Sequence, residues 1–425
     1  MIIISPAKNV LGAIRLPGDK SISHRYAMLA AIASGTSKFH NFSSGDDCAS
    51  TLRCIDQLGA KVRREDQSVE IDGLGVRLHP PSTALDCGNS GSTMRMLAGI
   101  LAGQDFASEL IGDESLSHRP MARVIEPLTL MGARIQAAER GLPPLHVKGG
   151  ALRAIDYSIP VASAQVKSAI LFAGLFAKGI TSVEEPVRTR DHSELALRAF
   201  GAEVQRSKNR VTVAGGQKLQ SIEAAIPGDI SSAAFFLCAA ALFPGSNLVI
   251  EGVLLNPTRA TLLDVLSAIG AKISVINLGE QHGELVGTVK VEHRRLRGTK
   301  ISGAQSASLI DELPVLAAIA PYTEDGIEIR DARELRVKES DRIAAVAKNL
   351  RAMGANVEEF DDGLRVPGGQ QLHGAQLDSS GDHRIAMAFA VAALKASSES
   401  QIYGEEAVTI SFPQFFSMLE GVTER

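Results

Sequence analysis

The chain has 425 residues, of which 45% are hydrophobic and 22% are charged, and its formal net charge is −4. This length exceeds what one hydrophobic core usually supports, so at least two domains are expected. A negative net charge, no tryptophan and 4% aromatic residues exclude a protein that holds nucleic acid by bulk positive charge or by base stacking.

Neither the first residues nor any later run indicates a membrane protein. Pro6 interrupts the first apolar stretch, which no basic segment precedes, so a signal peptide is not expected. The longest apolar run, 233–243, is far shorter than the ~20 residues that a membrane span needs. The four cysteines lack the spacing of a metal site or a catalytic cluster. We therefore expect a cytoplasmic protein with reduced thiols, bound to neither membrane nor nucleic acid.

Apolar, alanine-rich runs recur along the chain, and each begins with a short polar cluster. They are GDKSISHRYAMLAAIASG (18–35), GNSGSTMRMLAGILAG (88–103), SAQVKSAILFAGLFAKG (163–179), GDISSAAFFLCAAALFPG (228–245), DELPVLAAIA (311–320) and GDHRIAMAFAVAAL (381–394). Each run has the length of a helix and no polar face, which predicts a buried helix. Helix N-termini offer unpaired N–H groups and partial positive charge, so these starts indicate a ligand with several negative groups. Cations stand at several of them, namely Lys20, Arg25, Arg95, His383 and Arg384.

A second pattern, an apolar residue followed by Gly-Ala and then a β-branched residue, closes the amphipathic stretches between these runs. Its glycines are Gly59, Gly132, Gly201, Gly270 and Gly354. The pattern predicts a helix, a glycine at the helix C-terminus and then a strand. Further strands are expected at 68–73, 145–150, 211–216 and 363–369. The period of about 70–85 residues indicates duplicated supersecondary units.

The repeats divide naturally into two domains of three. Their boundary should fall near Pro227, just before the fourth apolar helix. The sixth unit lacks a clear Gly-Ala signature. The first residues, up to about Ala13, predict a strand whose domain the pattern does not decide.

The densest polar motif is PGDKSISHR (17–25). Lys20 is a point charge and Arg25 a planar fork, and Ser21 and Arg25 are four residues apart, so one helix face can present both. The alternative is a helix cap with solvated charges. A phosphate-binding P-loop is excluded because GDKS lacks a glycine directly before the lysine.

A second polar motif, ELRVKESDR (334–342), lies late in the chain. Lys338 and Arg342 are four apart and are expected on one helix face, with Glu339 beside them. A salt-bridged helix start is the alternative. Because Asp311 and Arg384 add charge at neighbouring helix starts, we favour a site in which a carboxylate next to lysine serves as a general acid or base.

These motifs resemble those of the enolpyruvyl transferases, most closely the branch that acts on shikimate 3-phosphate. The resemblance spans nearly the whole chain in order: PGDKSISHR, GNSGSTMR, SLSHRPM, SAQVKSA, TRDHSE, GDISSAAFF, DELPVLA, ELRVKESDR, DHRIAMA and SFP. It implies an α/β (α+β) fold: a two-domain inside-out α/β barrel, each domain built from three βαβαββ units around buried parallel helices. The implied domains are 14–226, with repeat units 1–3, and 1–13 plus 227–425, with repeat units 4–6.

The resemblance also implies a reaction of the shikimate pathway to chorismate and the aromatic amino acids. The enolpyruvyl group of phosphoenolpyruvate moves to the 5-hydroxyl of shikimate 3-phosphate and phosphate leaves, by addition and then elimination. Domain closure is expected to assemble the site, and a monomer with no metal and no other cofactor is implied. One alternative is the sister enzyme acting on UDP-N-acetylglucosamine, which usually has Lys-Asn where this chain has Lys20-Ser21. Another is an inactive anion-binding module on the same scaffold.

Residue roles follow from the matched motifs. The implied catalytic residues are Lys20, Asp311 and Glu339. Those implied for shikimate 3-phosphate are Lys20, Ser21, Arg25, Ser163, Ala164, Gln165, Arg190, Asp311 and Lys338. Those implied for phosphoenolpyruvate are Lys20, Asn89, Gly91, Arg119, Gln165, Glu339, Arg342, His383 and Arg384.

The chain departs from the common pattern at two places. Ala164 stands where many members have a second serine, so one phosphate contact is expected to be missing. Ile410 and Ser411 stand where many members have a lysine before Phe-Pro. Gly91 matches the glycine of members that the herbicide glyphosate inhibits, so inhibition competitive with phosphoenolpyruvate is expected.

Overall fold

The computed structural model describes residues 1–425, and the chain divides into two compact units. Unit 1 comprises 1–17, 227–279 and 285–425, and unit 2 comprises 18–226 and 280–284. The chain passes into unit 2 at Gly18 and not at residue 14, because strand β2 (Asn9–Arg15) continues to pair with β16 (Asn247–Leu254) as far as Arg15. The N-terminal strand therefore belongs to unit 1.

Unit 2 repeats one supersecondary arrangement, and its second copy shows the arrangement most clearly. This copy contains β6 (Leu85–Asp86), α3 (Gly91–Ala102), β7 (Ala107–Ile111), α5 (Ala122–Met131), β8 (Arg134–Ala138) and β9 (Leu142–Lys148). β6 and β7 are parallel, and β9 is antiparallel to both β7 and β8. The third copy has the same order: β10 (Asp156–Ser158), α6 (Ala164–Gly174), β11 (Ile180–Glu184), α7 (His192–Ala199), β12 (Val204–Ser207) and β13 (Arg210–Ala214). The short helix α4 (Glu114–Ser117) lies between the second copy's two longer ones.

The first copy takes its initial parallel strand from the end of the same unit. It contains α1 (Lys20–Ala31), β3 (Ala33–His40), α2 (Asp46–Gln57), β4 (Lys61–Glu65) and β5 (Ser68–Leu74). Strands β14 (Leu219–Gln220) and β15 (Glu223–Ala225) pair with β3 in parallel. The first apolar helix is shorter than its run predicts, because residues 33–35 already form β3.

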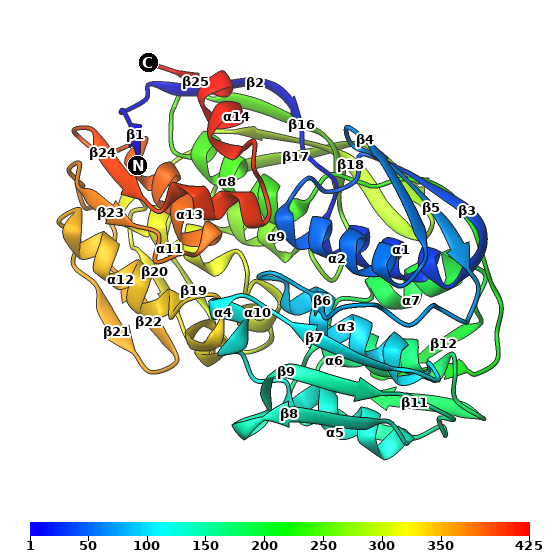
Figure 1. The fold of residues 1–425 in the computed structure, drawn as a ribbon. Coiled ribbons are helices and arrows are strands. Elements are labelled where there is room, and N and C mark those ends of the chain that lie inside the picture. Colours follow the sequence, from blue (N-terminus) through cyan, green and yellow to red (C-terminus); the bar gives the residue numbers. More distant parts are fainter. The chain divides into compact units, whose positions relative to one another are not determined.

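Unit 1 holds three further copies. The fourth contains β2, α8 (Ile230–Ala241), β16, α9 (Thr261–Ala268), β17 (Lys272–Gln281) and β18 (Glu284–Glu292). The fifth contains β19 (Thr299–Ile301), α10 (Ala304–Ser308), α11 (Leu313–Ile319), β20 (Ile327–Ile329), α12 (Arg342–Ala352), β21 (Glu358–Phe360) and β22 (Gly363–Val366). The sixth contains β23 (Gln376–Asp378), α13 (His383–Ala393) and β24 (Ser400–Tyr403). It has no hairpin of its own; β1 (Ile2–Ile4) pairs with β24, and α14 (Phe415–Val422) leads to β25 (Thr423–Glu424) against β2 (Figure 1).

The apolar runs form the buried centre of each unit, as their patterns predict. In unit 2, α3 packs against α1 and α6; in unit 1, α8, α11 and α13 pack against one another (Figure 1). Gly99 permits the close approach of α3 to α6, since a Cβ there would lie 2.2 Å from the Ala169 carbonyl oxygen. The side chains of Asp19, Ser90, Ser163, Asp229 and Asp382 each accept a hydrogen bond from the first turn of their helix. No helix is both long and apolar enough to cross a membrane.

The Gly-Ala signature is confirmed as a helix terminator. Its glycines all have positive φ, between 87° at Gly201 and 113° at Gly132, a range that other residues rarely adopt. They follow α2, α5, α7, α9 and α12, and in each case the chain turns there toward a strand. A local signal, glycine at positive φ, thus ends five helices of the chain.

Candidate active site

The N-terminus of α1 carries Lys20 and Ser21 directly after the capping residue Asp19. Asp19 accepts a hydrogen bond from the Ile22 N–H at 2.9 Å, which fixes the first turn. The Lys20 ammonium lies 2.8 Å from a carboxylate oxygen of Asp47 on α2, and the lysine side chain is 18% exposed. Lys20 is therefore held in place by Asp47 while part of its side chain is exposed.

Arg25, one turn further along α1, is buried among neutral groups. Its guanidinium donates to the Ser21 carbonyl at 2.8 Å, to the Ser193 hydroxyl at 2.7 Å and to the Ser168 hydroxyl at 2.9 Å. Burial lowers the pKa of Arg25 to about 10, and the charges of Glu194 and Asp19 only partly oppose this. Arg25 remains cationic at neutral pH, in surroundings where an added anion would be strongly favoured.

His24 joins the helix starts through a buried chain of hydroxyl groups. Its Nδ1 lies 2.7 Å from the Thr51 hydroxyl, which lies 2.6 Å from the Thr93 hydroxyl, which in turn donates to Ser90 at 2.8 Å. Burial, followed by the charges of Lys20 and Arg25, lowers the pKa of His24 well below its usual value. His24 is thus a neutral structural residue.

Asn89, in the turn before α3, is hydrogen-bonded to Arg119. Arg119 donates to the backbone carbonyl of Asn89 at 3.1 Å and to its side-chain oxygen at 2.7 Å. Asn89 in turn donates to Asp113 at 2.8 Å. A Cβ on Gly91 would lie 2.8 Å from an Arg95 guanidinium nitrogen, so the glycine leaves room for that arginine.

The start of α6 is linked to the start of α3. Arg95 donates to the Gln165 side-chain oxygen at 2.7 Å, and the Gln165 amide donates to the Ser92 hydroxyl at 2.8 Å. The hydroxyl of Ser163 caps α6 by accepting from the Val166 N–H. Ala164 is the first residue of that helix. The sequence placed Arg95 at a helix start suited to an anion but gave it no substrate role, and it did not single out Ser92.

The loop before α7 carries Arg190. Its backbone carbonyl accepts a hydrogen bond from the Lys167 ammonium at 2.9 Å, and its positive charge contributes to lowering the pKa of Arg25. The loop leads directly into α7, whose Ser193 accepts a hydrogen bond from Arg25. Glu284, at the end of the β17–β18 hairpin, pairs with His192 at 2.7 Å. No motif of the sequence indicated this glutamate.

In unit 1 a buried arginine, Arg342, gathers three carboxylates. Its side chain is 1% exposed, and it donates to Asp382 at 2.7 Å, to Glu339 at 2.7 Å and to Asp311 at 3.4 Å. Burial alone would lower the pKa of Arg342, but the charges of Asp382 and Glu339 outweigh it and raise that pKa. The N-terminal ends of α11, α12 and α13 meet at this residue.

Further cations surround the same acids. Arg384 donates to the Asp311 carbonyl at 3.0 Å, and its Nε lies 3.6 Å from the Asp311 carboxylate. Burial, opposed in part by the charge of Asp311, lowers the pKa of Lys338. His383 is buried with its Nδ1 3.9 Å from Asp382. These residues form an unusually dense set of acid and base groups. We call Asp311, Lys338, Glu339, Arg342, Asp382 and Arg384 the unit 1 cluster.

One expectation about this cluster was wrong. Lys338 and Arg342 do not share a helix face, because α12 begins only at Arg342 and Lys338 has extended backbone angles. Asp341 caps α12 by accepting from the Ala344 N–H at 3.0 Å. The charges of Asp311 and Glu339 act on both cations and favour the charged form of each, which raises the pKa of Arg342 and limits the fall in the pKa of Lys338.

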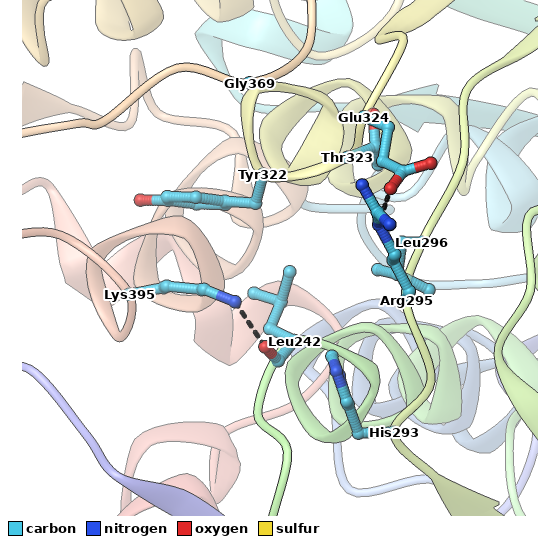
Figure 2. Close-up of a pocket in the computed structure, with 9 residues that line it drawn as sticks. All are labelled: Leu242, His293, Arg295, Leu296, Tyr322, Thr323, Glu324, Gly369 and Lys395. Atoms are coloured by element: carbon cyan, nitrogen blue, oxygen red, sulfur yellow. Dashed lines mark hydrogen bonds and ion pairs between the residues drawn. The ribbon is translucent and has the colours of Figure 1, made fainter.

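A cavity of about 310 Å³ lies elsewhere in unit 1, near the C-terminal ends of the buried helices. Figure 2 shows Lys395 reaching the Leu242 carbonyl and Arg295 facing Glu324. His293 lies 2.7 Å from the Ala241 carbonyl. Lys395 and His293 donate to carbonyl groups at the end of α8, so helix capping explains these two side chains, and Arg295 is explained by its ion pair with Glu324.

Comparison with solved structures identifies the class of fold. The enolpyruvyl transferase NikO from Streptomyces tendae has a TM-score of 0.77 at 18% identity, with 99% of this chain and 96% of that chain covered. At that identity the likeness shows the fold alone. EPSP synthase from Acinetobacter baumannii is more similar, with a TM-score of 0.89 and 42% identity over 99% of this chain and 98% of that one.

Sequence comparison identifies the family. The model of EPSP synthase (3-phosphoshikimate 1-carboxyvinyltransferase) matches residues 4–419. The 3-phosphoshikimate 1-carboxyvinyltransferase of Koribacter versatilis is 64% identical over 423 residues, and that of Solibacter usitatus is 55% identical over 422, with 99% of each chain covered in both cases. The chain belongs to the EPSP synthase family.

Proposed function

We propose that this chain transfers the enolpyruvyl group of phosphoenolpyruvate to the 5-hydroxyl of shikimate 3-phosphate and releases phosphate. The observation that carries the proposal is the unit 1 cluster, in which Arg342 holds Asp311 and Glu339 beside Lys338 in a chain of this family. Carboxylates next to cations can donate and accept protons while the cations stabilise anionic substrates. The reaction belongs to the shikimate pathway.

Shikimate 3-phosphate is assigned mainly to residues of unit 2. Lys20, Ser21, Arg25, Ser163, Gln165 and Arg190 bind its phosphate and ring, with Ala164 offering backbone only. Asp311 and Lys338 of unit 1 bind its hydroxyl groups. The support is that Arg25 is a buried cation held by neutral groups, with Arg190 nearby.

Phosphoenolpyruvate is assigned to residues of both units. Its cationic contacts are Lys20, Arg119, Arg342 and Arg384, joined by Asn89, Gly91, Gln165, Glu339 and His383. Arg119 is fixed by two bonds to Asn89, and Arg384 by its bond to the Asp311 carbonyl, so both guanidinium groups are preorganised. Neither unit carries the whole set, so we expect no activity from either unit alone.

The chemistry proceeds by addition and elimination. Glu339, aided by Lys20, donates a proton to the methylene carbon of phosphoenolpyruvate, while Asp311 accepts the proton of the attacking 5-hydroxyl. The new C–O bond gives a tetrahedral phospho-ketal. The C–O bond to phosphate then breaks and phosphate leaves with the proton that Asp311 had taken up, while a proton of the methyl group passes back to the Glu339 carboxylate and the double bond is restored. Cations stabilise the charge that grows on the departing phosphate.

The proposal includes the setting of the reaction. Units 1 and 2 act as the two domains of an inside-out α/β barrel, and the enzyme works as a cytoplasmic monomer. The repeated strand–helix order of both units supports the first point, and four buried free cysteines support a reducing compartment.

The test is phosphate release from phosphoenolpyruvate with one of two acceptors. Release with shikimate 3-phosphate and none with UDP-N-acetylglucosamine is expected. Release only with UDP-N-acetylglucosamine would reassign the acceptor. The protein could also release no phosphate with either acceptor. If it is folded and still binds both ligands of the proposed reaction, that result would favour an inactive anion-binding module.

A further inference from the structure

Behind the site in unit 2 lies a group of charges that the reaction does not use. We call Lys167, Glu185, Glu194 and Arg206 the buried charge cluster. The Lys167 ammonium lies 3.0 Å from Glu185 and 3.0 Å from Glu194, and these three side chains are at most 1% exposed. Arg206 of β12 contacts both glutamates, at 3.1 Å in the case of Glu185. Two cations thus balance two carboxylates away from water.

Stability alone is a weak reason for such a cluster. Removing several charges from water costs about as much as their attraction returns, and apolar residues of similar size often serve equally well. The contacts between the cluster and other residues therefore indicate its role better than the contacts among its own members do.

Most of those outgoing contacts reach the loop that carries Arg190; the exception is Arg206, which donates to the Lys208 carbonyl at 3.1 Å. The Lys167 ammonium donates to the Arg190 carbonyl at 2.9 Å. Glu185 accepts from the Thr189 backbone N–H at 3.2 Å and from the Thr189 hydroxyl. The cluster therefore fixes the backbone at two adjacent residues, directly where the loop presents Arg190.

Two serines that are adjacent in sequence to members of the cluster hold Arg25 by hydrogen bonds. Ser168 follows Lys167 on α6, Ser193 precedes Glu194 on α7, and both hydroxyls accept from the Arg25 guanidinium. Helices α6 and α7 thus hold both the guanidinium of Arg25 and the backbone that presents Arg190. Two cations bind one anion best when their supports are rigid before the anion arrives.

We propose that Lys167 is a positioning residue for shikimate 3-phosphate: its bond to the Arg190 carbonyl, braced by the buried charge cluster, keeps Arg190 next to Arg25, ready for an anionic group. This inference rests on the proposed function. Lys167 does not touch the substrate; it acts through Arg190.

A charge-balanced pair of variants separates positioning from simple support. Lys167→Met alone leaves two glutamates facing one arginine and is expected to destabilise the fold. Lys167→Met combined with Glu194→Gln leaves one glutamate paired with Arg206, so the charges again cancel. Glu194→Gln alone keeps the bond from Lys167 to Arg190. Lys272→Met, which removes an exposed pair with Glu292 in unit 1, is the matched control.

For the double variant we expect a melting temperature well above that of Lys167→Met and a KM for shikimate 3-phosphate raised about tenfold, in keeping with the loss of one charge-assisted hydrogen bond. Its KM for phosphoenolpyruvate should stay within about twofold, and Glu194→Gln and Lys272→Met should keep both KM values.

A double variant with an unchanged KM for shikimate 3-phosphate would overturn the inference, because the cluster would then only support the fold. Equal rises in both KM values would overturn it too, since they indicate a general loosening. If the wild-type protein released no phosphate with shikimate 3-phosphate, the proposed function itself would fail, and this outcome is read before any variant.

Discussion

Two buried arginines, one in each unit, show how the same side chain serves opposite purposes. Arg25 is held by a carbonyl and two hydroxyl groups, and burial lowers its pKa to about 10. Arg342 is held by three carboxylates, whose charges raise its pKa. The hydrogen-bond partners of Arg25 are neutral, whereas the charge of Arg342 is largely balanced by the carboxylates that it holds in place. Unit 2 is thus suited to binding an anion and the unit 1 cluster to moving protons.

The largest effect on turnover is expected from replacing Asp311, the carboxylate that should accept the hydroxyl proton. Asp311→Asn retains the shape of the side chain but cannot act as a base, so kcat should fall by roughly 10³, within the range typical of a lost general base. Steady-state phosphate release at saturating substrates measures this. A fall of less than about tenfold would assign the proton to another residue.

Arg342→Met should damage the fold itself. It leaves Asp311, Glu339 and Asp382 with their buried cation removed, which typically costs about 3–5 kcal/mol of unfolding free energy. Urea titration followed by circular dichroism gives this value. A variant as stable as the wild type would show that the three acids do not depend on Arg342 for their charge balance.

Arg25→Met should have the opposite effect to Arg342→Met: it should weaken substrate binding and leave the stability of the fold nearly unchanged. Its serine partners retain their bond to each other at 2.6 Å, so stability should change little. The KM for shikimate 3-phosphate should rise roughly 10- to 100-fold, because a charged hydrogen-bonding partner of the substrate is lost. Loss of stability with an unchanged KM would place Arg25 among structural residues.

Much of this arrangement could be predicted from the sequence because it is local. Capping residues such as Asp19 and Ser90, and helix-ending glycines such as Gly132, act through bonds within a few residues. The strand partners could not be predicted. β15 pairs with β3, and β2 with β16, across long separations in the chain, and nothing local specifies such a choice.

In the site, too, the sequence predicts residues within a motif but not their partners from distant elements. Lys20, Arg25 and Asp311 stand in motifs, but their partners Asp47, Ser193 and Arg384 come from other elements. The helical spacing of Lys338 and Arg342 misled because a spacing of four residues has meaning only inside a helix, and α12 starts too late to include Lys338.

A smaller effect is expected at Gly91. An added methyl group would lie 2.8 Å from the Arg95 guanidinium and would push it from its place beside Gln165. Gly91→Ala should therefore weaken inhibition by glyphosate about tenfold, with a smaller rise in the KM for phosphoenolpyruvate. Inhibition assays at several phosphoenolpyruvate concentrations measure both. Undiminished turnover of the wild type at millimolar glyphosate would contradict the expectation that glyphosate competes with phosphoenolpyruvate in this chain.

The most direct test of the account is the reaction run in deuterium oxide with shikimate 3-phosphate, with the product analysed by mass spectrometry. The proposed addition and elimination pass through a methyl group that gains a proton and then loses one, so the vinyl group of the product should contain deuterium. Glu339→Gln should still bind both substrates while product formation falls roughly 10²-fold or more. Product of the expected mass without deuterium in its vinyl group would contradict the mechanism, because the enolpyruvyl group would then have moved without protonation.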